Sequence, residues 1–137
     1  MDEGWFAEQH FVLFTEAEAR SAITRYGIAE ALPGYSLLGL AGWDNFLLRS
    51  PVGETFIAPT VPLGAGTLSP LEVPPASSLE PDSRFAGRVK WYVKPIAFGG
   101  DPSAKENLVW VSHQQHQDLV AWWNAKYREI KGSSAGA

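Results

Sequence analysis

Two histidines near the end of the chain have the spacing of a candidate metal site. His113 and His116 stand three positions apart in a segment with helical periodicity, so both side chains would project from one face of a helix. Such a pair could supply two nitrogen ligands, but a stable site needs at least one more. The neighbouring sequence offers no obvious third ligand, and Ser-His-Gln-Gln is an ordinary beginning for a helix. The sequence therefore predicts no metal and no other cofactor.

A polar turn before these histidines holds the other residues whose chemistry could be catalytic. Residues 99–102 could bind an anion through backbone N–H groups, but they lack the lysine and the strand–loop–helix setting of a phosphate loop. Asp101 and Glu106 could form a carboxylate pair, yet nothing in the adjacent sequence marks either as a general acid or base. No serine stands in the pattern of a hydrolase nucleophile. The sequence therefore predicts a structural turn, no catalytic residue and no enzyme activity.

An indole, a carboxylate and an amide stand side by side at 43–45. The plain interpretation is a core tryptophan at the start of a strand, followed by polar turn residues. The functional interpretation is an aromatic anchor beside a charged rim, a pattern typical of the dominant residues at protein interfaces. Further carboxylates stand in the irregular middle of the chain, where loops on a rigid scaffold often hold binding residues. The predicted partner-binding residues are Trp43, Asp44, Glu54, Glu72, Glu80 and Asp82.

The composition describes a chain of 137 residues with a formal net charge of −4, six tryptophans and no cysteine. The length fits one domain, and the lack of cysteine excludes disulfides and thiolate chemistry. The basic residues between Arg84 and Lys94 form only a small group, so nucleic acid is not the expected partner. An acidic protein is better suited to a basic protein partner, because opposite charges speed encounter. The sequence shows no signal peptide and no apolar run that could span a bilayer, which predicts a cytoplasmic location and no membrane partner.

The sequence of the first half of the chain predicts one helix followed by short strands. A helix is predicted over 16–26, because Thr15 and Glu18 form a capping box and Gly27 provides a C-terminal stop. Strand-like runs follow at 35–40, 43–49 and 54–58, and the turns between them favour an antiparallel meander. Six prolines within 59–81 cannot donate to a strand ladder, so this stretch is predicted to be a long loop. Two interpretations stay open: a packed surface loop, or a loop that binds a partner.

The second half returns to strands and ends in a helix. Residues that favour strands predict β-structure over 87–98 and 108–111, and Ser112 with Gln115 forms a second capping box. The last helix is predicted over 113–130, with Trp123 on its apolar stripe and Trp122 rotated out by about 100°. Residues 132–137 are predicted to form a flexible tail.

Several motifs together resemble the SUKH superfamily, which includes many immunity proteins of bacterial polymorphic and contact-dependent toxins. Leu-Pro-Gly-Tyr at 32–35 follows the first helix, and Gly-Trp-Asp at 42–44 and Pro-Thr-Val-Pro at 59–62 follow in the strand region. The most distinctive block runs from Phe98-Gly-Gly-Asp through Asn107 and His116 to Trp-Asn at 123–124. The resemblance covers about residues 15–130.

This resemblance implies an α+β fold: a single domain over 1–131, with a twisted, mainly antiparallel sheet and helices packed on one face. It also implies a non-catalytic protein that binds a cognate bacterial toxin and blocks its active site or substrate access. Such toxins are often nucleases, deaminases or ADP-ribosyl-transferring enzymes, and many are delivered by type VI secretion in bacterial competition. The expected partner is a toxin with a basic active-site surface. Two alternatives stay open: a regulatory or scaffold module of the same fold, and a small ligand-binding protein or enzyme that uses His113 and His116.

Overall fold

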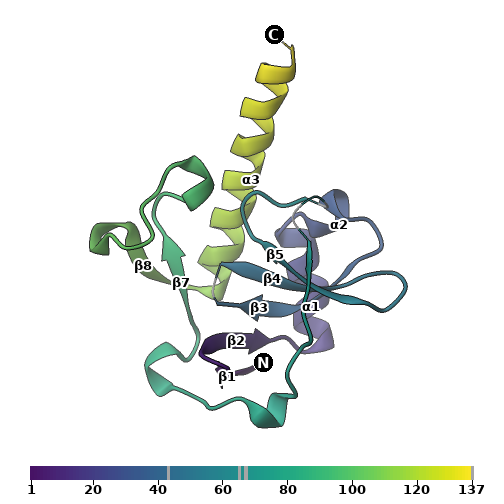
Figure 1. Cartoon of the computed structure of the whole chain (residues 1–137), viewed down its shortest axis with the longest axis vertical. Coiled ribbons are helices and arrows are strands. Elements are labelled where there is room, and N and C mark those ends of the chain that lie inside the picture. The colour runs from purple at the N-terminus through teal and green to yellow at the C-terminus, as the bar shows by residue number, and fades with distance from the viewer. Residues whose placement is uncertain (43, 65, 67, 137) are drawn as a thin grey trace.

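The computed structural model describes residues 1–42, 44–64, 66 and 68–136, with side chains up to residue 130. They form a small α+β domain, which confirms the predicted fold class (Figure 1). The strands are β1 (Asp2–Phe6), β2 (Gln9–Leu13), β3 (Ser36–Ala41), β4 (Asn45–Arg49), β5 (Thr55–Pro59), β6 (Ser69–Pro70), β7 (Arg88–Tyr92) and β8 (Leu108–Ser112). The helices are α1 (Glu16–Arg25), α2 (Ile28–Ala31) and α3 (His113–Gly136), with short 3₁₀ helices η2 (Ala76–Ser78), η3 (Ser83–Phe85), η4 (Ile96–Phe98) and η5 (Lys105–Asn107). Among the described helices, none is both long and apolar enough to cross a membrane.

Six strands form one antiparallel sheet in the order β1-β2-β3-β4-β5-β6, so each strand lies beside its neighbour in the sequence. The strands predicted at 35–40, 43–49 and 54–58 correspond to β3, β4 and β5. The β1–β2 hairpin lies outside the predicted elements. Its two turn residues, Ala7 and Glu8, have positive φ angles of 50° and 67°, where such turns usually hold asparagine or glycine. The usual sequence signal for the hairpin is therefore missing.

Helix α1 packs against β3 on one face of this sheet. Its capping box is confirmed, because the Glu18 N–H donates to Thr15 Oγ1 at 3.2 Å and the Thr15 N–H donates to Glu18 Oε1 at 2.8 Å. Gly27 follows the helix with a φ of 79°. Tyr26, at the end of α1, packs edge-on against Phe46 of β4, with 4.8 Å between the ring centroids. The larger hydrophobic core thus lies between the helices and this face of the sheet.

The proline-rich segment covers the opposite face of the sheet. After β6 the chain crosses the strands (Figure 1), and its apolar side chains pack on Phe11, Ala41 and Leu47. The covering side chains are Leu71, Val73 and Leu79. This part of the segment is a packed layer of the fold, which supports the first of its two interpretations.

Strands β7 and β8 form a separate two-stranded antiparallel sheet. The strand predicted over 87–98 stops at Tyr92, and Pro95 begins η4 in place of further strand. Helix α3 rises between the two sheets in Figure 1 and contacts β7, β8 and α1. Its capping box is confirmed by the Gln115 N–H, which donates to Ser112 Oγ at 3.1 Å, and by the Ser112 N–H, which donates to Gln115 Oε1 at 2.9 Å. The helix continues to Gly136 and so includes residues 132–136, where the sequence predicted a flexible tail.

A buried hydrogen bond joins the two main helices. The Tyr26 hydroxyl lies 2.6 Å from Nδ1 of His116, and both side chains are fully buried. Burial raises the pKa of Tyr26 far above its ordinary value, so the phenol keeps its proton while it hydrogen-bonds with the imidazole nitrogen. His116 also packs edge-on against Trp91 of β7, with 5.2 Å between the ring centroids. These contacts attach both helices and both sheets to one core.

Aromatic side chains attach the β1 edge to the segment before β7. Trp5 and His10 pack edge-on with their ring centroids 5.3 Å apart, and His10 is fully buried. Phe85 packs against His10 at 5.7 Å and stacks on Trp110 of β8 at 4.6 Å. The indole N–H of Trp5 donates to Asp82 at 3.2 Å. This cluster joins the large sheet to the small one.

Tyr26→Phe should lower the free energy of unfolding by about 1–3 kcal/mol, because the change leaves a buried imidazole nitrogen without its hydroxyl partner. Chemical denaturation followed by circular dichroism measures the loss. Tyr35→Phe is the matched control: the Tyr35 ring is half-buried beside Phe56, and losing its hydroxyl should change stability by less than about 0.5 kcal/mol. Equal losses in the two variants would contradict the role assigned to the Tyr26–His116 bond.

Stability should fall as the pH drops from about 7 to about 5, and His10 should contribute to that fall. Desolvation by burial lowers the pKa of His10 below its ordinary 6.5, and the carboxylates of Glu3 and Asp82 oppose this shift without reversing it. As the pH falls, His10 therefore gains its proton in the unfolded chain before it does in the folded chain. Its destabilising effect is absent well above the pKa of the unfolded chain and grows as the pH drops below it. His10→Phe keeps a ring but removes the titration, and its urea-denaturation stability should vary less with pH. Identical pH dependence in the two proteins would rule out this contribution.

Candidate functional site

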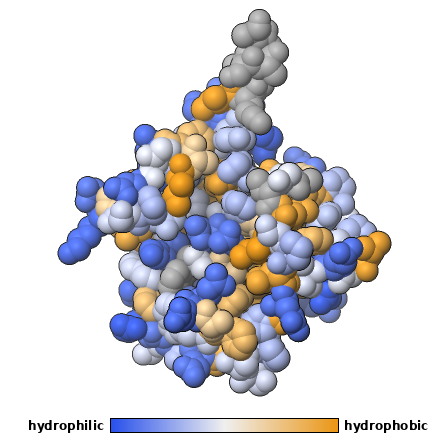
Figure 2. All heavy atoms as spheres, viewed as in Figure 1, coloured by the Kyte–Doolittle hydropathy of each residue, from blue (hydrophilic) through white to orange (hydrophobic). Residues whose placement is uncertain are grey.

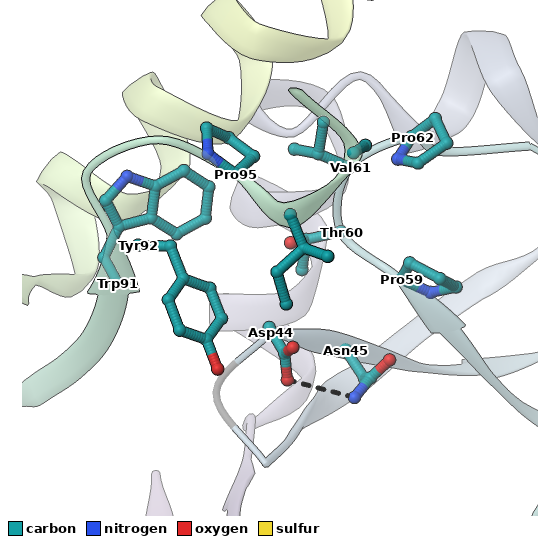
Figure 3. A pocket seen from close by; sticks show the side chains of 11 residues that line it. Asp44, Asn45, Pro59, Thr60, Val61, Pro62, Trp91, Tyr92 and Pro95 are labelled. Atoms are coloured by element: carbon teal, nitrogen blue, oxygen red, sulfur yellow. Dashed lines mark hydrogen bonds between the residues drawn. The ribbon is translucent and has the colours of Figure 1, made fainter. Parts of the chain in front are cut away.

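A cleft opens between the two sheets, where the start of β4 and the ends of β5 and β7 approach η4. Its volume is about 300 Å³. Figure 3 shows Trp91 and Tyr92 on one side, Pro59 and Pro62 on the other, and Asp44 at one end. Apolar groups therefore form most of the lining around a single carboxylate among the described residues. This site is named the Asp44 cleft.

Asp44 is partly buried at its end of the cleft. Burial raises the pKa of the Asp44 carboxyl, although a backbone hydrogen bond and the charge of Lys90 oppose the shift. The Asn45 side-chain amide donates to Asp44 Oδ1 at 3.2 Å, and the Thr60 N–H donates to the Asp44 carbonyl oxygen at 2.9 Å. The Tyr92 phenol is directed towards this end in Figure 3, and burial together with the Asp44 charge raises its pKa. The cleft thus ends at a carboxylate that has lost part of its hydration.

Asn124 of α3 holds one wall of the cleft. Its side-chain amide donates to the Thr60 carbonyl oxygen at 2.7 Å, and its Oδ1 accepts from the Leu63 N–H at 2.9 Å. Asn124 is buried, so it gives these backbone groups a partner in place of water. The wall at 59–63 is therefore tied directly to the central helix.

Asn107 holds the opposite wall in a similar way. Its Oδ1 accepts from the Lys94 N–H at 2.7 Å, and its Nδ2 donates to the carbonyl oxygens of Lys94 and Asp101, both at 3.1 Å. Gly100 lies so close to this loop that a Cβ there would be 1.8 Å from the Lys94 carbonyl oxygen. The glycine-containing block at 99–102 is thus folded around a buried asparagine, which supports its prediction as a structural turn.

A group of aromatic side chains continues from the cleft onto α3. Ala97 of η4 lines the cleft, and the next residue, Phe98, packs on Trp123 with 4.7 Å between the ring centroids. Trp122 packs edge-on against Trp123 at 4.9 Å and keeps 58% of its surface exposed, which confirms its predicted rotation out of the core. Tyr127 lies edge-on to Phe98 at 6.2 Å. These four aromatic residues are named the aromatic surface.

The predicted partner-binding residues lie in three separate places. Asp44 stands in the cleft, whereas Glu54 is at the other end of the β4–β5 hairpin, near the exposed Glu72 that follows β6. Glu80 and Asp82 lie at the β1 edge on the opposite side of the sheet. The structure therefore does not bring these carboxylates onto one acidic face. The remaining predicted residue, Trp43, lies outside the described residues.

The titratable groups do not form a metal site among the residues that the structure describes. His113 Nε2 lies 3.0 Å from Glu3 Oε1, whereas His116 faces Tyr26. Although they share a helix, the two histidines thus make different contacts. Asp101 accepts two hydrogen bonds from Ser103 within its own turn. The cleft and the aromatic surface instead offer mainly apolar and aromatic area for contact.

A second groove, of about 480 Å³, lies between α1 and strands β3 and β4. Its charged side chains include Glu16 and Arg20, which pair with each other at 3.3 Å. Phe14 is the aromatic residue in its described lining. This groove lacks the aromatic walls and the isolated carboxylate that distinguish the Asp44 cleft.

Most of the cleft was not predictable as a site from local patterns. Trp91, Tyr92 and Pro95 stand far from Asp44 in the sequence, and no local pattern indicates that the two sheets meet there. The usable signals were the motif at 43–45, which marked Asp44, and the Pro-Thr-Val-Pro stretch at 59–62, because its prolines exclude a central strand. No family model matches this chain, and neither a curated protein nor a solved structure matches it. The functional argument therefore depends on the site itself and on the motifs of the sequence.

Asn124→Ala should destabilise the protein by about 1–3 kcal/mol for each of the two backbone groups that lose their partner. Urea denaturation gives the total loss, and the amide signals of residues 60–63 should shift in nuclear magnetic resonance spectra. Arg128→Ala is the matched control, because Arg128 is exposed one turn later on α3 and should change stability by less than about 0.5 kcal/mol. A stable Asn124→Ala variant with unshifted wall signals would contradict the role of Asn124.

Proposed function

We propose that this protein is an immunity protein that binds a cognate bacterial toxin in the cytoplasm and blocks its active site or substrate access. The observation that carries the proposal is the aromatic surface on η4 and α3, which continues into the Asp44 cleft. Large aromatic side chains dominate many protein interfaces, because their rings bury much area and few torsions must be fixed. The motifs shared with the SUKH superfamily support a toxin as the class of partner.

The exposure of apolar side chains on this side of the molecule supports a protein partner. Trp122 is 58% exposed, and Ile96 of η4 and Ile130 of α3 are each 48% exposed. Elsewhere, on the face drawn in Figure 2, apolar side chains occur in separate patches among hydrophilic ones. An apolar group rimmed by polar residues is a common feature of binding surfaces. A partner that covers Trp122 would remove this area from water.

The polar groups of the cleft favour recognition over catalysis. Asn107 and Asn124 make their hydrogen bonds to backbone groups of the walls, so their amides serve the shape of the site. Asp44 accepts from the Asn45 amide, and no nucleophile stands beside a base in the described lining. The proposed mode of action is therefore stoichiometric inhibition. Delivery of the toxin by type VI secretion is part of the same proposal, and it places the encounter in the recipient's cytoplasm.

Trp122→Asp should weaken binding to the toxin encoded beside this protein's gene by about tenfold or more, equal to at least about 1.4 kcal/mol. The reason is that the change puts a charge into an apolar contact that the bound toxin would shield from water. Isothermal titration calorimetry with the purified toxin measures the effect. Val52→Asp is the matched control, because Val52 is 80% exposed in the β4–β5 turn and should leave affinity unchanged.

Growth provides the second readout of this experiment. Cells that make the toxin should grow only when this protein is made with it, and the Trp122→Asp variant should protect them less. Absence of both binding and protection would show that the proposed function is wrong. Binding to several unrelated proteins without protection would favour the scaffold alternative.

A further inference from the structure

The Asp44 carboxylate is partly buried, and its partners among the described residues are hydrogen-bond donors: the Asn45 amide and a backbone N–H. The Asn45 amide donates to Oδ1, but no lysine, arginine or histidine of the described residues forms an ion pair with this carboxylate. Lys90 of β7 is close enough to lower the pKa of Asp44 electrostatically. A partly dehydrated carboxylate is stabilised in its charged form when a cation approaches. The cleft therefore has the electrostatic character of a site for a cation.

The walls narrow the choice of cation. The half-buried Tyr92 and Trp91, which keeps only 3% of its surface exposed, stand on one side of the cleft, and Pro59 and Pro62 stand on the other (Figure 3). A guanidinium group is planar and weakly hydrated, stacks on aromatic faces and forms forked hydrogen bonds with a carboxylate. An ammonium group is compact and strongly hydrated, so an apolar cleft would cost it more hydration. Flat apolar walls with one carboxylate at the end therefore suit arginine better than lysine.

The cleft is held in shape before any partner arrives. Asn124 fixes one wall through Thr60 and Leu63, and Asn107 fixes the other through Lys94. The Thr60 N–H also donates to the Asp44 carbonyl oxygen, which links the carboxylate-bearing residue to the first wall. A side chain that enters this site does not have to order its walls, so little conformational entropy is lost.

We propose that the Asp44 cleft receives one arginine side chain of the toxin, with the guanidinium group at Asp44 and the aliphatic stem between the aromatic and proline walls. The identity of the partner rests on the proposed function, whereas the selectivity of the cleft for a guanidinium group can be measured without it. An arginine held in this way would be withdrawn from the basic surface that grips the toxin's substrate.

The direct test uses small probes and the intact protein. N-acetyl-arginine methylamide should bind saturably and shift the indole N–H signal of Trp91 and the backbone amide signal of Tyr92 in nuclear magnetic resonance titrations. N-acetyl-citrulline methylamide has nearly the same shape but a neutral urea group, and it should bind about tenfold more weakly or worse. N-acetyl-lysine methylamide should also bind more weakly than the arginine probe. These comparisons need no variant, so they cannot be confused with misfolding.

A pair of charge-neutralising variants assigns the selectivity to one residue. Asp44→Asn should reduce binding of the arginine probe about tenfold, to the level of the citrulline probe. Glu54→Gln is the matched control, because it removes the same charge at the exposed far end of the β4–β5 hairpin and should leave probe binding unchanged. The amide spectrum of each variant shows whether it is folded.

Several results would overturn the inference. They are no saturable binding of the arginine probe, equal binding of the arginine and citrulline probes, equal binding of the lysine probe, and unchanged arginine binding by a folded Asp44→Asn variant. A toxin that binds normally while the probes show no preference would overturn only this inference. Selective arginine binding without any toxin binding or protection would instead overturn the proposed function.

Discussion

The contact between Tyr26 and His116 is the interaction on which the arrangement of the molecule depends. The Tyr26 ring lies against Phe46 of the large sheet, and the His116 ring lies against Trp91 of the small sheet. The hydrogen bond between them joins the C-terminal end of α1 to the first turn of α3. Four elements far apart in the sequence therefore meet in one buried group of rings. The distance between the sheets, and so the width of the Asp44 cleft, follows from this meeting.

The cleft shows how buried amides can shape a surface site. Where a wall lacks regular strand pairing, its backbone N–H and C=O groups have no hydrogen-bond partners on a neighbouring strand. Burying such groups without a partner destabilises the fold. Asn107 and Asn124 satisfy several of them, so the irregular stretches beside η4 and after β5 keep defined positions. The polar side chains nearest the cleft thus maintain its form, and the surface left for a partner is largely aromatic and apolar.

Local patterns predicted the local structure well. Both capping boxes formed as expected at Thr15 and Ser112, and the meander of β3, β4 and β5 followed from short apolar runs and turn residues. The β1–β2 hairpin lacked a glycine or asparagine at Ala7 and Glu8, so its turn gave no signal. The cleft depended on how two sheets pack, which no spacing within the sequence records. Among the predicted binding residues that the structure describes, Asp44 alone lies in the cleft, because the other carboxylates follow loops that end elsewhere on the sheet.

The outer strands of the large sheet limit how copies of this protein can meet. β6 has only two residues, and the second is Pro70, whose nitrogen has no proton to donate. On the other side, the Trp5 N–H donates to the Glu80 carbonyl oxygen at 2.8 Å, and the Glu80 N–H returns a bond to Trp5 at 3.0 Å. An open strand edge exposes unpaired N–H and C=O groups, so a strand of another molecule can pair with it and begin aggregation. With both edges of the large sheet shortened or occupied, it is a poor template for a growing fibril. The protein can therefore accumulate with less risk of aggregation through this sheet.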